Sequence, residues 1–181
     1  PYAAIPYKAQ SFFNISGMSY GAISKPAVRA LSRGARMAGC WMNTGEGALS
    51  PYHLEGEADI VFQIGTAKFG VRDAVGNLDD DRLRAIAAHT QVKMFELKLA
   101  QGAKPGKGGI LPAAKITDEI AEIRGIPKGQ DGISPNRHRE AGNTAELLDL
   151  IAHIREVTGK PVGIKTVMGH LSHFEELFTE I

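Results

Sequence analysis

The chain has 181 residues, of which 43% are hydrophobic and 23% are charged, and this composition is typical of a globular domain. The formal net charge is +1, with Lys and Arg spread along the chain, which excludes a broad basic surface for nucleic acid; no apolar run reaches the roughly 20 residues of a membrane helix. The single cysteine, Cys40, excludes an internal disulfide framework and a multi-cysteine metal or iron–sulfur site within this chain, and it favours the reducing cytoplasm.

The two ends of the sequence suggest a piece of a longer protein. The chain begins without methionine and stops at Ile181, directly after an apolar, helix-like run. Residues 1–14 are rich in proline and aromatic residues. We expect them to lie extended against the domain.

The next segments predict a strand, a helix and a second strand. Residues 15–21 are typical of a short strand that ends in small residues. Ser24 is a candidate N-cap for the following helix, which Gly39 would end. Residues 40–42 predict a second short strand, again followed by a small-residue loop at 43–47.

The middle of the chain repeats this rhythm. Residues 60–64 predict a strand and 65–70 its loop. Three aspartates open a helix expected over 79–89, where negative charge suits the helix dipole. Residues 94–99 then predict a buried strand whose apolar pattern is interrupted by a glutamate and a lysine.

A cationic, glycine-rich loop follows that strand. It holds four glycines and one proline, and Lys98, Lys104 and Lys107 concentrate positive charge where the strand ends. Such a loop suits a bound phosphate or carboxylate. Its glycine spacing does not match a nucleotide P-loop, and no dinucleotide-binding glycine fingerprint follows a strand in the required register.

The second half again alternates strands and helices. A helix is expected over 117–124, an extended piece over 131–135 and a long amphipathic helix over 143–159. Residues 162–167 predict a buried strand, and 170–181 return to a helix-like pattern.

This alternation predicts an α/β fold with a parallel sheet and outer helices. Polar residues recur at strand ends, where a (β/α)8 barrel and a doubly wound sheet both place their sites. A complete barrel needs about 250 residues, so we expect its N-terminal half here, as one domain over 1–181. Lys165 lies in a strand interpreted as buried, which favours a functional role. His170 and His173 are three apart, but a solvated pair is favoured and no metal site is predicted.

Six motifs, spread over nearly the whole chain, carry a family resemblance. They are Ser-Gly-Met-Ser-Tyr-Gly-Ala-Ile-Ser at 16–24, Asn-Thr-Gly-Glu-Gly at 43–47, Phe-Gly-Val at 69–71, Lys-Leu-Ala-Gln-Gly-Ala-Lys-Pro-Gly at 98–106, Ile-Ser-Pro at 133–135 and Ile-Lys at 164–165. In order and spacing they resemble the FMN-binding domain of glutamate synthases, and most closely the stand-alone FMN-binding glutamate synthase-like proteins.

The resemblance implies a (β/α)8 barrel in which reduced FMN passes a hydride to 2-iminoglutarate, formed from 2-oxoglutarate and ammonia, to give L-glutamate. It implies that the cofactor is bound by Met18, Ser19, Thr44, Lys98 and Lys165. It assigns 2-oxoglutarate to Gly21, Gln101, Lys104 and Arg124. Lys98 and Lys165 would act in catalysis near the flavin, together with Glu46 on the side where ammonia arrives.

The resemblance also implies partners, and it leaves alternatives open. An amidotransferase, an electron-donor subunit or ferredoxin are implied, with an iron–sulfur cluster whose ligands are not in this chain. Lys107 stands where the family usually has an acidic residue, and Ile110 stands where it has glutamine. One alternative is an N-methylglutamate synthase-like dehydrogenase that uses an amine. Another is a regulatory or assembly module that binds an anion without redox chemistry.

Overall fold

The computed structural model describes residues 2–102, 104, 108–167 and 169–180, without the side chains of 173 and 180. Lys107, one of the two departures from the family pattern, therefore lies outside the described residues.

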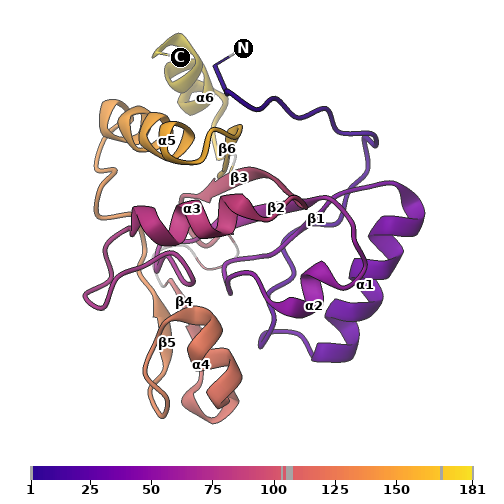
Figure 1. Cartoon of the computed structure of the whole chain (residues 1–181). Helices are drawn as coiled ribbons and strands as arrows, with labels where there is room; N and C mark the ends of the chain where they lie inside the picture. Colours follow the sequence, from indigo (N-terminus) through magenta and orange to yellow (C-terminus); the bar gives the residue numbers. More distant parts are fainter. Residues whose placement is uncertain (1, 103, 105–107, 168, 181) are drawn as a thin grey trace.

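A four-stranded parallel sheet forms the centre of the molecule (Figure 1). Its strands, in spatial order, are β1 (Met42–Asn43), β2 (Ile60–Ile64), β3 (Val92–Lys98) and β6 (Val162–Lys165). The spatial order follows the chain order without a reversal, which is the order a singly wound barrel has and a doubly wound sheet lacks. The α/β class and the parallel sheet are confirmed, and the closed barrel stays a prediction.

Four of the predicted helices begin directly after a residue that caps them. In each case the cap side chain accepts a backbone N–H of the first turn. These helices, each followed by its cap, are α1 (Lys25–Ala38, Ser24), α3 (Asp80–Ala88, Asp79), α4 (Asp118–Arg124, Thr117) and α5 (Thr144–Thr158, Asn143). Gly39 and Gly159 end α1 and α5 with φ of 64° and 70°, as predicted.

The remaining elements are short or lie at the periphery. They are α2 (Pro51–Leu54), a 3₁₀ turn η1 (Ala113–Lys115), α6 (Leu171–Glu180) and an antiparallel pair of β4 (Gly109–Leu111) with β5 (Gly132–Ser134). The sequence did not indicate α2 or β4. With α4, the β4–β5 pair projects from one end of the sheet (Figure 1). Among the described residues, no helix is long and apolar enough to cross a membrane.

The strand predicted at 15–21 is reduced to a single parallel bridge between Ile15 and Met42. The chain turns instead of continuing extended, since Tyr20 forms a bridge with Ile23. The N-terminal segment lies against the domain as expected. The N–H of Ile5 donates to the carbonyl of Gly159 at 2.8 Å, and the Tyr7 hydroxyl donates to Asp59 at 3.0 Å.

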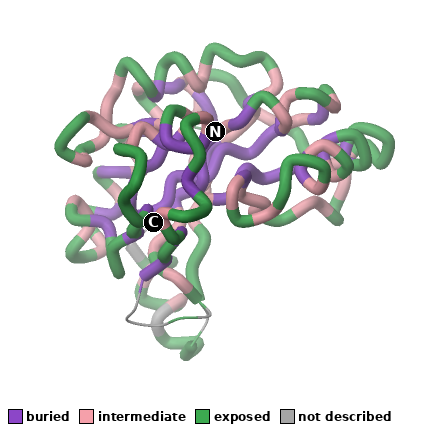
Figure 2. Tube along the Cα trace, turned by 90° about the horizontal axis from the view of Figure 1, so that it is seen from below, coloured by how far each residue is buried: buried purple, intermediate pink, exposed green. Residues whose placement is uncertain are grey.

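The two faces of the sheet differ in chemistry. Phe62 and Phe95 are register partners on β2 and β3, and their rings meet edge to face at 5.6 Å in the core. Buried residues run along these central strands (Figure 2). Gln63 and Glu96 come next along the two strands and are also partners. Because alternate side chains point to opposite faces, the glutamate that interrupts the apolar pattern lies on a polar face, opposite the face that holds Phe62 and Phe95.

The prediction that the strand at 162–167 is buried is wrong. The strand β6 ends at Lys165 and is half-buried, and Lys165 itself is exposed. The physical reason is its place: β6 is an edge strand of the described sheet and pairs with β3 alone.

Candidate functional site

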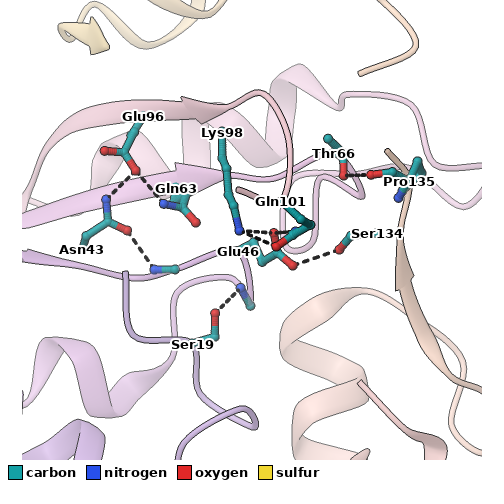
Figure 3. Close-up of polar contacts among 12 residues, drawn as sticks. Ser19, Asn43, Glu46, Gln63, Thr66, Glu96, Lys98, Gln101, Ser134 and Pro135 are labelled. Atoms are coloured by element: carbon teal, nitrogen blue, oxygen red, sulfur yellow. Dashed lines mark hydrogen bonds and ion pairs between the residues drawn. The ribbon is translucent and has the colours of Figure 1, made fainter. Parts of the chain in front are cut away.

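The carboxylate of Glu46 lies at the centre of a polar cluster at the carboxyl end of the sheet (Figure 3). Its Oε2 lies 3.1 Å from Lys98 Nζ and accepts a hydrogen bond of 2.6 Å from Gln101 Nε2. Its Oε1 accepts a hydrogen bond of 3.1 Å from the Ser134 hydroxyl, and Lys98 also donates to Gln101 Oε1 at 2.8 Å. The loop after β1, the end of β3 and the strand β5 are thereby joined.

Two glycines form walls around Glu46. A Cβ added at Gly65 would lie 2.6 Å from Glu46 Cβ, and one added at Gly109 would lie 2.9 Å from Glu46 Oε1. A side chain at either position would displace the carboxylate. The side chains of Glu46 and Lys98 are only 18% and 14% exposed, so their ion pair is less screened than a surface pair.

A cavity of about 160 Å³ opens beside this cluster. It is lined by residues from the sheet end, from the glycine-rich loop, from α4 and from the β4–β5 pair. Its lining residues are Ser19, Ala22, Glu46, Gln101, Lys104, Gly109, Ile110, Leu111, Arg124, Gly132 and Ser134. The structure therefore brings together five of the predicted site residues: Ser19, Glu46, Gln101, Lys104 and Arg124.

Arg124 is a buried cation on the wall of that cavity. The residue is 4% exposed, and its Nη2 donates to the carbonyl of Tyr20 at 3.2 Å. Its Nε is buried without a hydrogen-bond partner, and no ion pair joins it to any described residue. Burial lowers the pKa of the Arg124 guanidinium, and the charge of Glu46 opposes that shift. Since arginine stays protonated in proteins, the wall of the cavity holds a buried positive charge that makes no ion pair with any described residue.

The other predicted substrate and cofactor residues do not line the cavity. Gly21 lies next to Arg124, because a Cβ added there would be 3.5 Å from Arg124 Nη2. Lys165 is the register partner of Lys98, so its Cα lies at the same end of the sheet. The Thr44 hydroxyl is buried and already bonded, since it donates to the Gly45 carbonyl at 2.9 Å and accepts the Gln63 N–H at 3.0 Å.

Met18 lies in the loop before α1, and its position depends on a residue that sequence reasoning left without a role. His53 is buried, and its Nδ1 accepts the N–H of Ser50 at 3.1 Å, so the proton is on Nε2. That N–H donates to the carbonyl of Met18 at 2.8 Å. Burial lowers the pKa of the His53 imidazole, which is consistent with the neutral form.

A second buried histidine, His138, lies between β5 and α5 and contacts the end of β3. His138 Nε2 donates to the carbonyl of Lys98 at 2.8 Å, and burial lowers the pKa of its ring. Close by, Lys68 is 2% exposed and its Nζ lies 3.0 Å from Glu140 Oε1. No sequence signal distinguished Lys68, Glu140 or His138 from loop residues, because their contacts join segments some 40 to 72 positions apart.

A third feature is Glu96, noted in the sequence only as an interruption of an apolar strand. Its Oε1 accepts hydrogen bonds from Asn43 Nδ2 at 2.9 Å and from Gln63 Nε2 at 2.5 Å (Figure 3). The period-two alternation of β2 and β3 is the signal that would have placed it with Gln63 on one face. Within the described residues, no three His, Cys, Asp or Glu side chains are grouped so as to hold a metal ion.

The conserved region in glutamate synthase matches residues 4–179. The glutamate synthase large subunit-like protein YerD of Bacillus subtilis (strain 168) is 47% identical over 177 residues, which cover 97% of this chain and 34% of that protein. The archaeal-type glutamate synthase [NADPH] of Thermotoga maritima is 40% identical over 157 residues, covering 86% of this chain and 28% of that protein. The chain spans about a third of the length of the curated relatives it matches.

Proposed function

This chain belongs to the glutamate synthase family, and on that premise we propose that it carries part of the site of an FMN-dependent oxidoreductase. The proposed reaction is the reductive amination of 2-oxoglutarate, through 2-iminoglutarate, to L-glutamate. The observation that carries the proposal is the buried guanidinium of Arg124, which makes no ion pair with any described residue, in the wall of a polar cavity at the strand ends. Because the chain spans about a third of the length of these relatives, the activity of a whole protein is part of this proposal.

The cavity suits a dicarboxylate. Arg124 and Lys104 both line it, and a substrate with two carboxylates needs two cations or equivalent donors. The planar guanidinium of Arg124 can bind one carboxylate through two parallel N–H groups. Gln101 donates to Glu46 and would hold that carboxylate in the cavity wall, with its own amide beside the ligand.

The proposed flavin site is the polar face at the carboxyl end of the sheet. Lys98 and Lys165 are register partners at that end, which supports the proposal because two cations there would stabilise an anionic reduced flavin. The small-residue loops at 15–21 and 43–47 approach each other closely, since a Cβ added at Gly45 would lie 2.4 Å from Ser19 Oγ. When bound, FMN would supply the hydride. We propose Met18, Ser19 and Thr44 as the residues of these loops nearest to it.

Glu46 is the residue that we propose for the nitrogen side of the reaction. Its carboxylate lines the cavity and accepts hydrogen bonds from Lys98, Gln101 and Ser134. In this position the carboxylate can bind ammonium beside the oxo group of the substrate. The ammonia source and the electrons lie outside this chain, and we propose an amidotransferase and an electron-donor subunit or ferredoxin as partners. The expected iron–sulfur cluster would take its cysteines from elsewhere, since Cys40 is the one cysteine here.

The test uses the protein that carries this chain, expressed over its full length in the cytoplasm, where we propose it works. We expect a yellow preparation that binds FMN. After chemical reduction of the flavin without oxygen, 2-oxoglutarate and ammonium should reoxidise it and yield one glutamate per flavin. A colourless protein that cannot be reconstituted with FMN would contradict the proposal and favour the non-redox anion-binding module.

A second candidate follows from Ile110, which lines the cavity with an apolar side chain. An apolar wall would accept the methyl group of methylamine better than a glutamine would, which favours an N-methylglutamate synthase-like dehydrogenase. The same single-turnover assay with methylamine in place of ammonium separates the two. Ile110→Gln should shift the preference toward ammonium, and an unchanged preference would remove Ile110 from the argument.

A further inference from the structure

We infer that Glu96 is a positioning residue that fixes the two small-residue loops, 15–21 and 43–47, against each other. The inference deepens the proposed function, because these loops are the proposed flavin-binding surface. Glu96 positions the loops through Asn43, and its carboxylate accepts hydrogen bonds from neighbouring strands on the polar face of the sheet. Neither the family comparison nor the cavity assigns it a role.

The carboxylate of Glu96 accepts hydrogen bonds from two neighbouring strands. A single oxygen, Oε1 of Glu96 on β3, accepts from Asn43 Nδ2 on β1 at 2.9 Å and from Gln63 Nε2 on β2 at 2.5 Å (Figure 3). Three neighbouring strands are thereby joined through their side chains on the polar face. The register partner of Glu96 on its other side is Gly163, which adds no side chain beside the carboxylate.

The Asn43 amide contacts both Glu96 and Gly45. Its Nδ2 faces Glu96, and its Oδ1 accepts the N–H of Gly45 at 2.9 Å. Rotating the amide by half a turn would place an NH₂ group against that N–H and an oxygen against the carboxylate, so both contacts would become repulsive. Glu96 therefore selects one amide orientation, and that orientation holds Gly45 in place.

Asn43 also contacts the loop 15–21. A Cβ added at Gly17 would lie 3.2 Å from Asn43 Oδ1 and 3.3 Å from Gln63 Nε2, so the loop 15–21 packs directly on both amides. The N–H of Met18 donates to the Asn43 carbonyl at 3.1 Å. Gly45 has φ of +63°, where other residues are strained, and its backbone lies against Ser19. A shift of Asn43 would move both loops.

This mechanism distinguishes two substitutions of Glu96. Glutamine keeps one carbonyl oxygen that can accept from both amides, so Glu96→Gln should retain the loop geometry. Leucine has a similar bulk but no acceptor, so Glu96→Leu leaves both NH₂ groups without their partner and frees the Asn43 amide to rotate. A role that depended on the charge of Glu96 would make both variants equally poor.

The experiment measures FMN affinity, the visible spectrum of the bound flavin and amide hydrogen exchange at 43–47 in the full-length protein. We expect Glu96→Leu to raise the FMN dissociation constant by about tenfold or more, to alter the flavin spectrum and to speed exchange at Gly45. Glu96→Gln should remain within about threefold of the wild type. Glu156→Leu, which removes an exposed carboxylate from α5, is the matched control and should change none of these.

The outcomes separate this inference from the proposed function. If the wild type does not bind FMN, the proposed function fails, and the exchange data alone decide the role of Glu96. Unchanged exchange in Glu96→Leu, or equal losses in the Leu and Gln variants, would overturn the inference. Should Glu96→Leu not fold, Asn43→Ala removes the side chain that links Glu96 to Gly45. That variant should give the faster exchange, and slow exchange in it would equally refute the inference.

Discussion

The substitution Arg124→Met tests the charge on which the proposed substrate site depends. Methionine keeps an unbranched apolar stem but removes the guanidinium, which is 4% exposed and has a buried Nε without a partner. A carboxylate that binds to this group gains a charge-assisted hydrogen bond worth about 1.5–3 kcal/mol. Losing it should weaken 2-oxoglutarate binding by about 10- to 150-fold, because each 1.4 kcal/mol changes the dissociation constant by about tenfold.

The effect on folding should be small, and this makes the test specific. The variant loses the hydrogen bond to the Tyr20 carbonyl at 3.2 Å and the contact of the guanidinium with the Phe69 ring at 5.0 Å, each worth about 1 kcal/mol. It also removes a buried cation that makes no ion pair with any described residue, which offsets that loss. We therefore expect the free energy of unfolding to change by no more than about 1 kcal/mol.

The assay is isothermal titration of 2-oxoglutarate into the full-length protein, paired with urea unfolding of each variant. Arg36→Met, which removes an exposed arginine from the last turn of α1, is the control and should leave affinity unchanged. An unaltered dissociation constant in Arg124→Met would refute the reasoning. A loss of stability above about 3 kcal/mol would show instead that Arg124 is a structural residue.

Three further predictions concern single groups. Lys104→Ala should weaken 2-oxoglutarate binding by about 1.5–3 kcal/mol in the same titration, and an unchanged affinity would remove Lys104 from the site. Burial lowers the pKa of His53 below its ordinary 6.5. The neutral imidazole therefore contributes its full stabilisation above about pH 6.5, and this stabilisation is lost as the pH falls from that value toward the lowered pKa. In urea unfolding, the stability of His53→Gln should depend less on pH than that of the wild type, and identical pH profiles would contradict this. Glu140→Gln leaves the Lys68 ammonium buried without its carboxylate and should lower the unfolding free energy by about 3 kcal/mol. The double variant with Lys68→Met should recover most of that loss, and additive losses would exclude a coupled pair.

Local sequence signals predicted the helices well. Ser24 caps α1 as predicted, and the predicted starts of the other three helices coincide with their caps Asp79, Thr117 and Asn143, because a cap is a contact between residues two or three apart. At α5 the carboxylate of Glu146 accepts the N–H of Gly142 at 2.7 Å and therefore does not close a capping box on Asn143.

Contacts between distant segments were beyond sequence reasoning. The pairing of β4 with β5 and the Lys68–Glu140 ion pair join residues far apart in the chain, and nothing in either segment alone indicates its partner. Lys165 was misjudged for a related reason: an apolar strand looks the same at the edge of a sheet as in its middle. The grouping of Ser19, Glu46, Gln101, Lys104 and Arg124 was foreseen through the family resemblance, whereas spacing alone indicated only that strand ends meet.

The two glycines that wall Glu46 determine where this site can evolve. At positions 65 and 109 a methyl group would already collide with the carboxylate, so these positions tolerate little variation while Glu46 keeps its place. Ile110 lies one residue further on, lines the same cavity and is 60% exposed, so its side chain can change size and polarity without disturbing the fold. A library meant to broaden the range of oxo acids or amines should therefore randomise 110 and keep 65 and 109 constant.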